Sequence, residues 1–182
     1  MLITLVVRVE NRPGVLNRVA SLFRRRGFNI ESLTVGHTEK PGISRMTIVV
    51  DTDESGAMRL EANLYKLVNV LNVENVTATP SVFRDLAMIK VAATAETRAE
   101  IMQLAHVFRA RIVDVNNGSL VIESTGTEDK IDGLIEVLRE YGILEMARTG
   151  RVAMTRGSGK EASTSAEERK DSLSDESVSY SV

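Results

Sequence analysis

The sequence predicts an α+β protein that consists of two small modules of the same design, followed by a polar tail. Strand patterns and amphipathic helix patterns alternate, and the same order of patterns occurs twice in the 182-residue chain. After the second copy, residues 157–182 contain eight serines, six acidic residues and three basic residues, but few large apolar ones. Such a segment buries too little surface to offset its ordering entropy. We therefore expect a disordered tail; a peptide that orders on a partner is the alternative.

The composition of the chain excludes several classes of function. The formal net charge is −2, which gives no indication of binding to nucleic acid or to an acidic membrane surface. There is no cysteine and there are two histidines, so disulfides are excluded and little remains for a zinc or catalytic cluster. No apolar run approaches the roughly 20 residues of a membrane span, and the N-terminus lacks the basic region of a signal peptide. We therefore expect a cytoplasmic protein.

The first module begins with an apolar strand over residues 2–9. An amphipathic helix is expected over residues 14–26, because apolar residues recur there at helical spacing. Gly27 should end this helix in the left-handed conformation, and the three arginines before it suit the negative end of the helix dipole. The apolar face of the helix is expected to consist of Val15, Leu16, Val19, Leu22 and Phe23.

Two further strands, a second helix and a short strand complete the first module. Residues 29–38 are expected to form the second strand, and residues 44–51 the third, since apolar residues alternate there. A short strand within residues 73–80 closes the order β-α-β-β-α-β. The apolar positions that mark the second helix are Ala57, Leu60, Leu64, Leu67, Val68 and Leu71.

The second module repeats this order. A strand is expected at residues 84–93, a hairpin at 111–124 with Asn117-Gly118 as its turn, and a last strand at 142–154. The two helices between them are marked by Ile101, Leu104, Ala105 and Phe108, and by Ile131, Leu134, Ile135 and Leu138. Two copies of this topology predict two ferredoxin-like modules, each a four-stranded antiparallel sheet with two helices on one face.

We place the module boundaries at residues 1–80 and 81–156. The face of each sheet that carries no helix is then expected to be buried against another surface. In the first strand, the face opposite the expected core is too apolar to be exposed to solvent. This face carries Leu2, Thr4, Val6 and Arg8. We therefore predict association, between the modules or between chains.

The junction of the first strand and the first helix, ENRPGVLNRV at residues 10–19, is a candidate ligand site. Asn11 is expected to be the N-cap of the helix, and Pro13 then falls in the first turn, where its missing amide costs little. Gly14 lets a ligand or another backbone approach closely. A helix N-terminus with free amides and little side-chain bulk can bind an anion. The alternative is an ordinary turn between strand and helix.

The stretches ENRPGVLNRVASLFRRRGFNIESLTVG and GISRMTIVVD strongly resemble the regulatory (small) subunits of acetohydroxyacid synthase, also called acetolactate synthase. The resemblance continues through YKLVNVLNVENV, RIVDV and ARTGRVAMTRG, and covers essentially residues 1–157. It implies that the first module is an ACT domain, a small-molecule-sensing ferredoxin-like unit.

The resemblance also implies a function. Small subunits of this family have no active site and no cofactor of their own. They bind a large catalytic subunit, which uses thiamine diphosphate, magnesium and FAD to make acetolactate or acetohydroxybutyrate from pyruvate. They raise its activity and confer feedback inhibition by valine or another branched-chain amino acid, such as leucine or isoleucine.

In this family the effector lies between the ACT domains of a homodimer. The residues that match the family's contacts are Asn11, Gly14, Val15 and Leu16 from one chain, and Asn29 and Ile30 from the other. Two residues of the stretch at 10–19 depart from the family pattern. Pro13 stands where serine or another small residue is frequent, and Val15 replaces alanine in some members, which narrows the expected pocket and bears on effector preference.

Other classes of function remain to be weighed. A free-standing amino-acid sensor with a different partner is the main alternative. RNA-recognition modules share the topology, but they stack bases on aromatic residues of the central strands. LITLVVRVE and SRMTIVVD contain no aromatic residue. An enzyme is not indicated, because no nucleophile–base pair, paired catalytic carboxylates or cofactor loop is recognisable.

Overall fold

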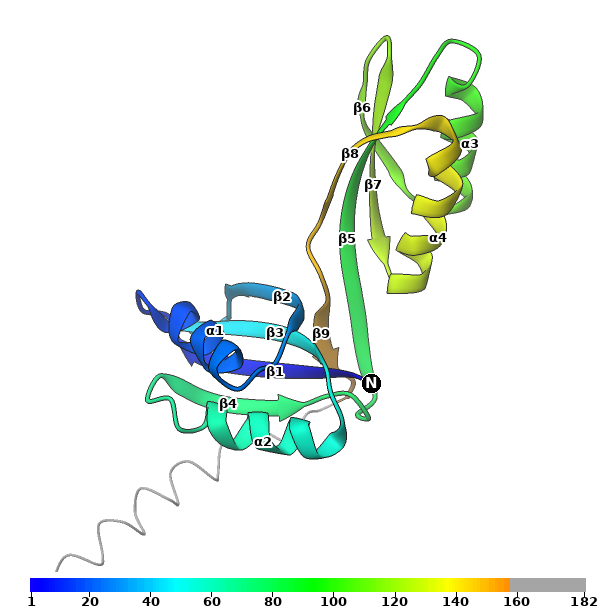
Figure 1. Cartoon of the computed structure of the whole chain (residues 1–182). Coiled ribbons are helices and arrows are strands. Elements are labelled where there is room, and N and C mark those ends of the chain that lie inside the picture. The colour runs from blue at the N-terminus through cyan, green and yellow to red at the C-terminus, as the bar shows by residue number, and fades with distance from the viewer. Residues whose placement is uncertain (158–182) are drawn as a thin grey trace, which may run out of the picture.

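A computed structural model describes residues 1–157 of the protein, and the tail predicted at residues 157–182 lies, apart from Gly157, outside the described residues. Figure 1 shows two α+β modules joined by the long strand β5 (Ser81–Ala92). The elements of the first module are β1 (Leu2–Glu10), α1 (Val15–Arg25), β2 (Ile30–His37), β3 (Ile43–Asp51), α2 (Glu54–Leu64) and β4 (Val70–Asn75). β5 is followed by α3 (Arg98–Val107), β6 (Arg111–Val115), β7 (Ser119–Gly126), α4 (Glu128–Leu138), the 3-10 turn η1 (Arg139–Tyr141), β8 (Ile143–Arg148) and β9 (Val152–Thr155).

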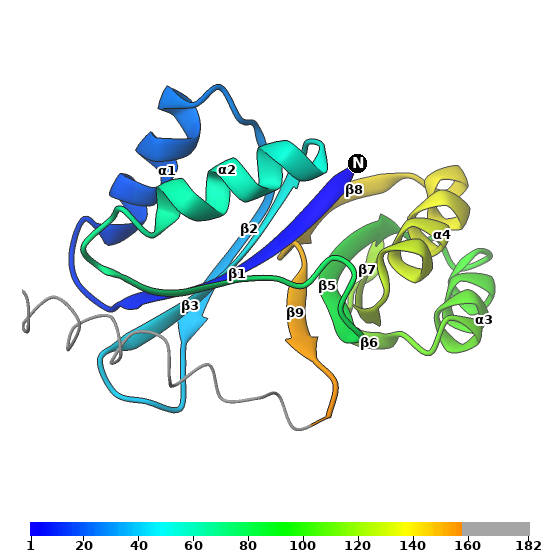
Figure 2. The same cartoon turned by 90° about the horizontal axis from the view of Figure 1, so that it is seen from below.

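Both modules have the predicted ferredoxin-like topology. The first sheet has the strand order β2-β3-β1-β4 and the second has the order β6-β7-β5-β8, with antiparallel neighbours throughout. The two helices of each module cover one face of its sheet, and Figure 2 shows α1 and α2 above the first sheet. The predicted α+β fold class and the β-α-β-β-α-β order of both copies are therefore confirmed. No helix of residues 1–157 is long and apolar enough to cross a membrane.

Each module has its own apolar core between sheet and helices. In the first, Leu5 of β1 and Ile48 of β3 meet Phe23 of α1 and Leu60 of α2. In the second, Ile89 and Ile122 of the sheet meet Ile101, Ile131 and Leu134 of the helices. The alternation of the strands and the 3.6-residue period of the helices put these side chains on facing surfaces. Burial of apolar surface against the helices is thus what fixes the strand register of both sheets.

Helix α1 ends as the sequence predicts. Gly27 has φ 73°, its N–H donates to the carbonyl of Arg24 (3.2 Å), and the N–H of Phe28 donates to the carbonyl of Phe23 (3.0 Å). This pair of bonds is a Schellman motif, which satisfies carbonyls that the last turn of a helix leaves free. The sequence also predicts Leu16 on the apolar face of α1, and this is wrong. Leu16 is 45% exposed, because the buried stripe runs through Val15, Val19, Leu22 and Phe23.

The second helix is shorter than expected. α2 ends at Leu64, Val68 is 93% exposed, and Leu71 lies in β4, which begins at Val70. Leu67 still packs against the core, but from a turn. The spacing of Leu64, Leu67 and Leu71 fits a continuous helix as well as it fits a turn followed by a strand. The Tyr65 hydroxyl accepts from the N–H of Val73 on β4 (3.1 Å), which stabilises the turn and strand.

The last predicted strand, residues 142–154, is two strands. β8 continues the second sheet, whereas β9 leaves it at Thr149–Arg151 and pairs with the first part of β5. β9 then lies on the helix-free face of the first sheet (Figure 2). Ala153 of β9 is buried there with Val6 and Val76, and Phe83 of β5 packs against them. The association predicted for this face is therefore confirmed between the modules of one chain.

Candidate functional site

The connection between β1 and α1 contains four of the six residues expected to bind an effector. Gly14 is the N-cap residue of α1 and has φ 82°, a left-handed conformation that favours glycine. A Cβ built at this position would meet nothing within 4 Å, so the space next to the glycine is free. Val15 is buried as the first residue of α1, and Leu16 projects outward beside it.

The prediction that Asn11 caps α1 is wrong. The helix begins three residues later than such a cap requires, and α1 has no side-chain hydrogen bond at its N-terminus. Gly14 takes the position because its left-handed backbone turns the chain into the helix. Asn11 instead holds the base of the loop: its N–H donates to the carbonyl of Gly42 (2.7 Å), and its Nδ2 lies 3.4 Å from Nδ1 of His37. Pro13 likewise precedes the helix.

The N-terminal turn of α1 differs from those of the other three α-helices in residues 1–157. It has neither a side-chain cap nor an acidic residue. At α2, the carboxylate of Asp53 accepts from the N–H of Gly56 (2.7 Å), and α3 and α4 have acidic residues in their first turns. The first amides of a helix have no intrahelical acceptor, and the helix dipole is positive there. The amides at the start of α1 therefore suit an anionic group.

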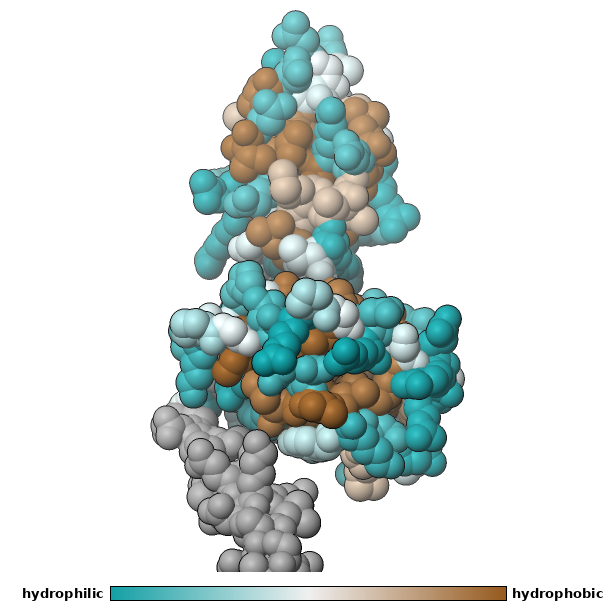
Figure 3. Space-filling model, turned by 90° about the vertical axis from the view of Figure 1, so that its left-hand side faces the viewer, coloured by the Kyte–Doolittle hydropathy of each residue, from teal (hydrophilic) through white to brown (hydrophobic). Residues whose placement is uncertain are grey.

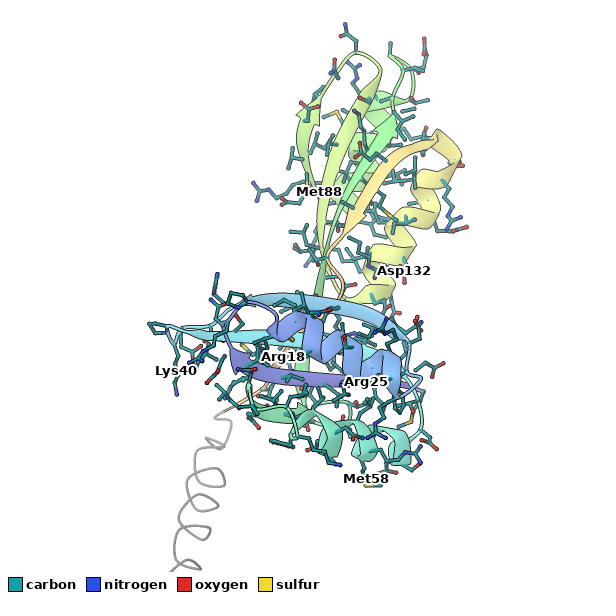
Figure 4. All side chains as sticks on the ribbon, turned by 60° about the vertical axis from the view of Figure 1, so that its left-hand side comes forward. Arg18, Arg25, Lys40, Met58, Met88 and Asp132 are labelled. Carbon is teal, nitrogen blue, oxygen red and sulfur yellow. The ribbon has the colours of Figure 1, made fainter. Side chains whose placement is uncertain are left out.

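A polar network that was not predicted fixes the loop in place. Arg18 of α1 donates to Oδ1 of the buried Asn69, and Asn69 Nδ2 donates to Glu10 Oε2 (2.7 Å). Glu10 Oε2 also lies 3.2 Å from Nε of Arg12. Figure 4 shows Arg18 on α1. The only signal in the sequence was an asparagine between two apolar residues, which does not identify a partner 51 positions away.

The remaining two site residues lie at the other end of α1. Asn29 directly precedes β2, and its Nδ2 donates to Oε1 of Glu31 (2.6 Å), which leaves its Oδ1 as an acceptor. Ile30 is half-buried and packs against the first core. α1 has 11 residues and is therefore about 16 Å long. A single chain thus keeps the Gly14 cluster (Asn11, Gly14, Val15 and Leu16) apart from the Asn29 cluster (Asn29, Ile30 and the neighbouring Glu31).

The described residues do not assemble a metal centre. Within residues 1–157, no three His, Cys, Asp or Glu side chains come together in a way that could hold a metal ion. What the Gly14 cluster can offer is amide donors, a positive helix end and the exposed Leu16 side chain, and what the Asn29 cluster can offer is amide and carboxylate acceptors. Together these groups match the parts of an aliphatic amino acid.

Comparison with known proteins identifies the family. A family model described as the small subunit of acetolactate synthase matches residues 84–157, and one described as an AHAS small subunit-like ACT domain matches residues 5–72. The chain belongs to the acetolactate synthase small-subunit family. The predicted family and the predicted ACT domain in the first module are thus confirmed.

Relatives in this family cover nearly the whole described chain. A probable acetolactate synthase small subunit of Archaeoglobus fulgidus is 55% identical over 157 residues, which are 86% of this chain and 98% of the relative. The acetolactate synthase small subunit of Mycolicibacterium smegmatis is 51% identical over 154 residues, 85% of this chain and 91% of the relative. The crystal structure of the acetolactate synthase small subunit from Thermotoga maritima matches with a TM-score of 0.81 and 41% identity, covering 87% of this chain and 99% of that chain.

Proposed function

We propose that this chain is the non-catalytic regulatory subunit of an acetolactate synthase in branched-chain amino acid biosynthesis. It binds a large catalytic subunit, which holds the thiamine diphosphate, magnesium and FAD. The chain raises the activity of that subunit and makes it sensitive to feedback inhibition. The effector is a branched-chain amino acid, with valine as the first candidate and leucine or isoleucine as alternatives. The observation that supports this most directly is the uncapped N-terminus of α1 in a chain of this family. The protein acts in the cytoplasm.

A homodimer through the ACT domains completes the effector site. β2 is an edge strand of the first sheet, so its outer side has no neighbouring strand within residues 1–157. Edge strands of this kind readily pair with another chain. If two chains pair along β2 about a two-fold axis, the start of α1 in one chain comes next to the end of α1 in the other. The Gly14 cluster of one protomer then faces Asn29 and Ile30 of its partner.

Each part of the effector has a matching group. The amide of Val15 donates to the carbonyl of Arg12 (3.3 Å), so the carboxylate is received by the neighbouring amides of Gly14 and Leu16 at the start of α1. The free Oδ1 atoms of Asn11 and Asn29 accept from the ammonium group. Leu16 of one protomer and Ile30 of its partner line the space for the branched side chain. The exposure of Leu16, which the helix pattern did not predict, supports this role because the side chain is available to a ligand or a second chain.

The energies involved agree with a metabolite sensor. The helix-end field contributes about 0.3–1 kcal/mol when it is exposed to solvent, which is too little to retain a small ligand. Charge-assisted hydrogen bonds add roughly 1.5–3 kcal/mol each when the site is enclosed. The expected Kd lies between about 1 µM and 1 mM. Because the ligand binds one arrangement of the two subunits better than another, it shifts their population, and a coupling of about 1–3 kcal/mol gives 5- to 150-fold effects.

Reconstitution with a large subunit tests the function. The purified chain is mixed with an active acetolactate synthase large subunit, and acetolactate formation is measured with and without valine, leucine and isoleucine. The rate should rise on mixing and fall when the effector is added. If an active large subunit shows no rise while the chain still binds an aliphatic amino acid in equilibrium dialysis, the free-standing sensor is the better description.

A further inference from the structure

The strand that carries the Asn29 cluster also contacts the second module. β2 pairs with β3, and the register shifts by one residue between Ile30 and Ser32. An irregularity of this kind re-aims the side chains on either side of it. Ile30 packs against the core under the helices, whereas Ser32 faces the opposite side of the sheet, where the second module lies. One strand therefore joins the candidate effector residues to the module junction.

The segment Thr149–Arg151, which links β8 to β9, is docked on β2. Ser32 Oγ accepts from the N–H of Arg151 (3.0 Å), and Thr34 Oγ1 donates to the carbonyl of Thr149 (3.2 Å). Between them, Gly150 has φ 82°, and a Cβ built on it would lie 2.3 Å from Ser32 Oγ. Two hydrogen bonds and this close approach hold the link against β2.

The Arg151 side chain connects both modules at the same point. Its guanidinium donates to Thr4 Oγ1 of β1 (2.9 Å) and to Oε2 of Glu128 (2.5 Å). Glu128 is the first residue of α4. It also lies over the Phe83 ring, 5.2 Å from the centroid. The Arg151 side chain is only 18% exposed. Partial burial strengthens these contacts and makes the loss of one partner costly.

Arg148, the last residue of β8 and directly before the link, also contacts α4. Arg148 Nε donates to Asp85 Oδ2 (2.8 Å), and its Nη1 donates to Asp132 Oδ1 (2.7 Å). Glu128 and Asp132 are four residues apart and therefore share one face of α4. Figure 4 shows Asp132 on this helix. Arg148, directly before the link, and Arg151, within it, thus both form ion pairs with α4.

A cavity that is open to solvent lies at the junction of the modules. It has a volume of about 470 Å³, and its lining includes Ser32, Asp85, Glu128 and Gly150. Packed protein interiors transmit displacements but leave little room for them. The cavity provides room for the link to change its position against β2 while the cores of both modules stay intact.

We propose that Ser32, Arg151 and Glu128 form the coupling route by which the effector state of β2 changes the position of α4 and hence of the second module. This inference rests on the proposed function and extends it, because it names the contacts through which regulation leaves the ACT domain. A change at Asn29 and Ile30 alters β2, β2 displaces the link through Ser32, and Arg151 displaces α4 through Glu128.

Two mild substitutions interrupt the route. Ser32→Ala removes the acceptor of the Arg151 N–H, and Glu128→Gln removes the charge that holds the Arg151 guanidinium. The matched control is Arg139→Gln, which breaks the exposed Arg139–Glu136 pair (3.1 Å) at the C-terminal end of α4, away from Glu128. Circular dichroism and thermal unfolding check that all three variants fold.

The main readout is the holoenzyme reconstituted with the large subunit. Both route variants should activate it like the wild type and should still bind valine as free small subunits. The valine concentration for half-inhibition should rise about fivefold or more, whereas Arg139→Gln should leave it unchanged. The double variant should lose little more than the larger single effect, because both changes act on one route. Normal inhibition in both route variants would overturn the proposal.

A second readout does not need the large subunit. Amide hydrogen exchange of the small subunit is measured with and without saturating valine. Valine should change the protection of α4 in the wild type and in Arg139→Gln, but not in Glu128→Gln. If valine binds and α4 does not respond in the wild type, the coupling route is wrong while the effector site stands. If the wild type binds no aliphatic amino acid, the proposed function itself fails.

Discussion

Helix α1 of the first module and helix α4 of the second occupy different environments at their N-terminal turns, although both belong to the same fold. α1 starts at a left-handed Gly14 with no cap and no acidic residue. α4 starts after Thr127 with Glu128 and Asp129 in its first turn, and Glu128 binds Arg151 within the chain. The positive end of α4 is thus matched by acidic side chains of the same helix, whereas that of α1 has no acidic side chain in its first turn.

The helix-free sheet faces show the opposite contrast between the two modules. In the first module this face is covered by β9, and Val6 is 1% exposed. In the second module no element of residues 1–157 covers it, and Met88 is 43% exposed. Figure 3 shows this side of the second module, with apolar groups among polar ones, and Figure 4 shows Met88 on the side away from α4. The first module thus combines a covered sheet face with a helix α1 that has no acidic residue in its first turn. The second module combines an uncovered sheet face with a helix α4 that has two.

The covered face can be tested with a matched pair of truncations. Val6→Ala removes two buried methyl groups and leaves a cavity, so it should lower the free energy of unfolding by about 2 kcal/mol. Val121→Ala makes the same change on the uncovered face of the second sheet, where the side chain is only partly buried, and should cost less than about 1 kcal/mol. Urea denaturation measures both, and equal losses would contradict the contrast between the faces.

A carboxylate side chain introduced at the start of α1 tests whether the amides there bind the effector. Gly14→Asp places a carboxylate where the effector carboxylate is expected, and should weaken valine binding about tenfold or more. Gly14→Asn is the control: it has nearly the same shape and tolerates the left-handed backbone, but has no charge. Isothermal titration with valine separates the two variants. An equal loss in both would show that side-chain bulk or backbone strain, and not the charge, weakens binding.

A smaller change makes α1 resemble α4. Asn17→Asp adds an acidic residue to the first turn of α1, where it competes for the helix dipole, and should weaken valine binding about two- to fivefold. Asp129→Asn removes an acidic residue from the first turn of α4 and should leave valine binding unchanged. The same titration compares them, and the effect of Asn17→Asp should shrink in high salt.

The smallest expected effect concerns the capped helix α2. The N–H of Gly56 and the hydroxyl of Ser55 donate to Asp53 and hold the pKa of its carboxyl below the usual value. A lowered pKa in the folded state gives stability that is complete above the unfolded pKa of about 3.9 and is lost as the pH falls through the folded value. Between pH 6 and pH 3, the Tm of the wild type should therefore fall slightly more than that of Asp53→Asn. An equal fall in Tm in both proteins would show that the Asp53 carboxylate does not stabilise the start of α2 in this way.

The sequence was sufficient for the local parts of the fold. The cores of both modules and the cap at Gly27 follow from side-chain period and from glycine chemistry, which depend on neighbours along the chain. It was not sufficient where distant segments decide. The apolar run after Leu64 fits helix and strand alike, and contact between Tyr65 and β4 selects the strand. The split of the last strand at Gly150 depends on a close approach to Ser32, more than 100 residues away.

The candidate site shows the same limit. The open helix start near Gly14 was predicted from residue types, but the cap at Asn11 was not correct, because the left-handed Gly14 turns the chain later than a side-chain cap would. The network of Arg18, Asn69 and Glu10 links three separate segments, and the link from Ser32 to Arg151 joins two modules. Such polar contacts leave no periodic signal in a sequence. Whether the six expected residues bind the effector stays a prediction.

The position of β9 has a consequence for synthesis of the protein. The first module ends near Val76, yet the strand that covers its sheet ends at Thr155. At about 5–20 residues per second, a ribosome needs roughly 4–16 s to make the intervening segment. During that interval the earliest-made domain carries an unprotected apolar surface, so its maturation waits for nearly the last part of the described chain to emerge.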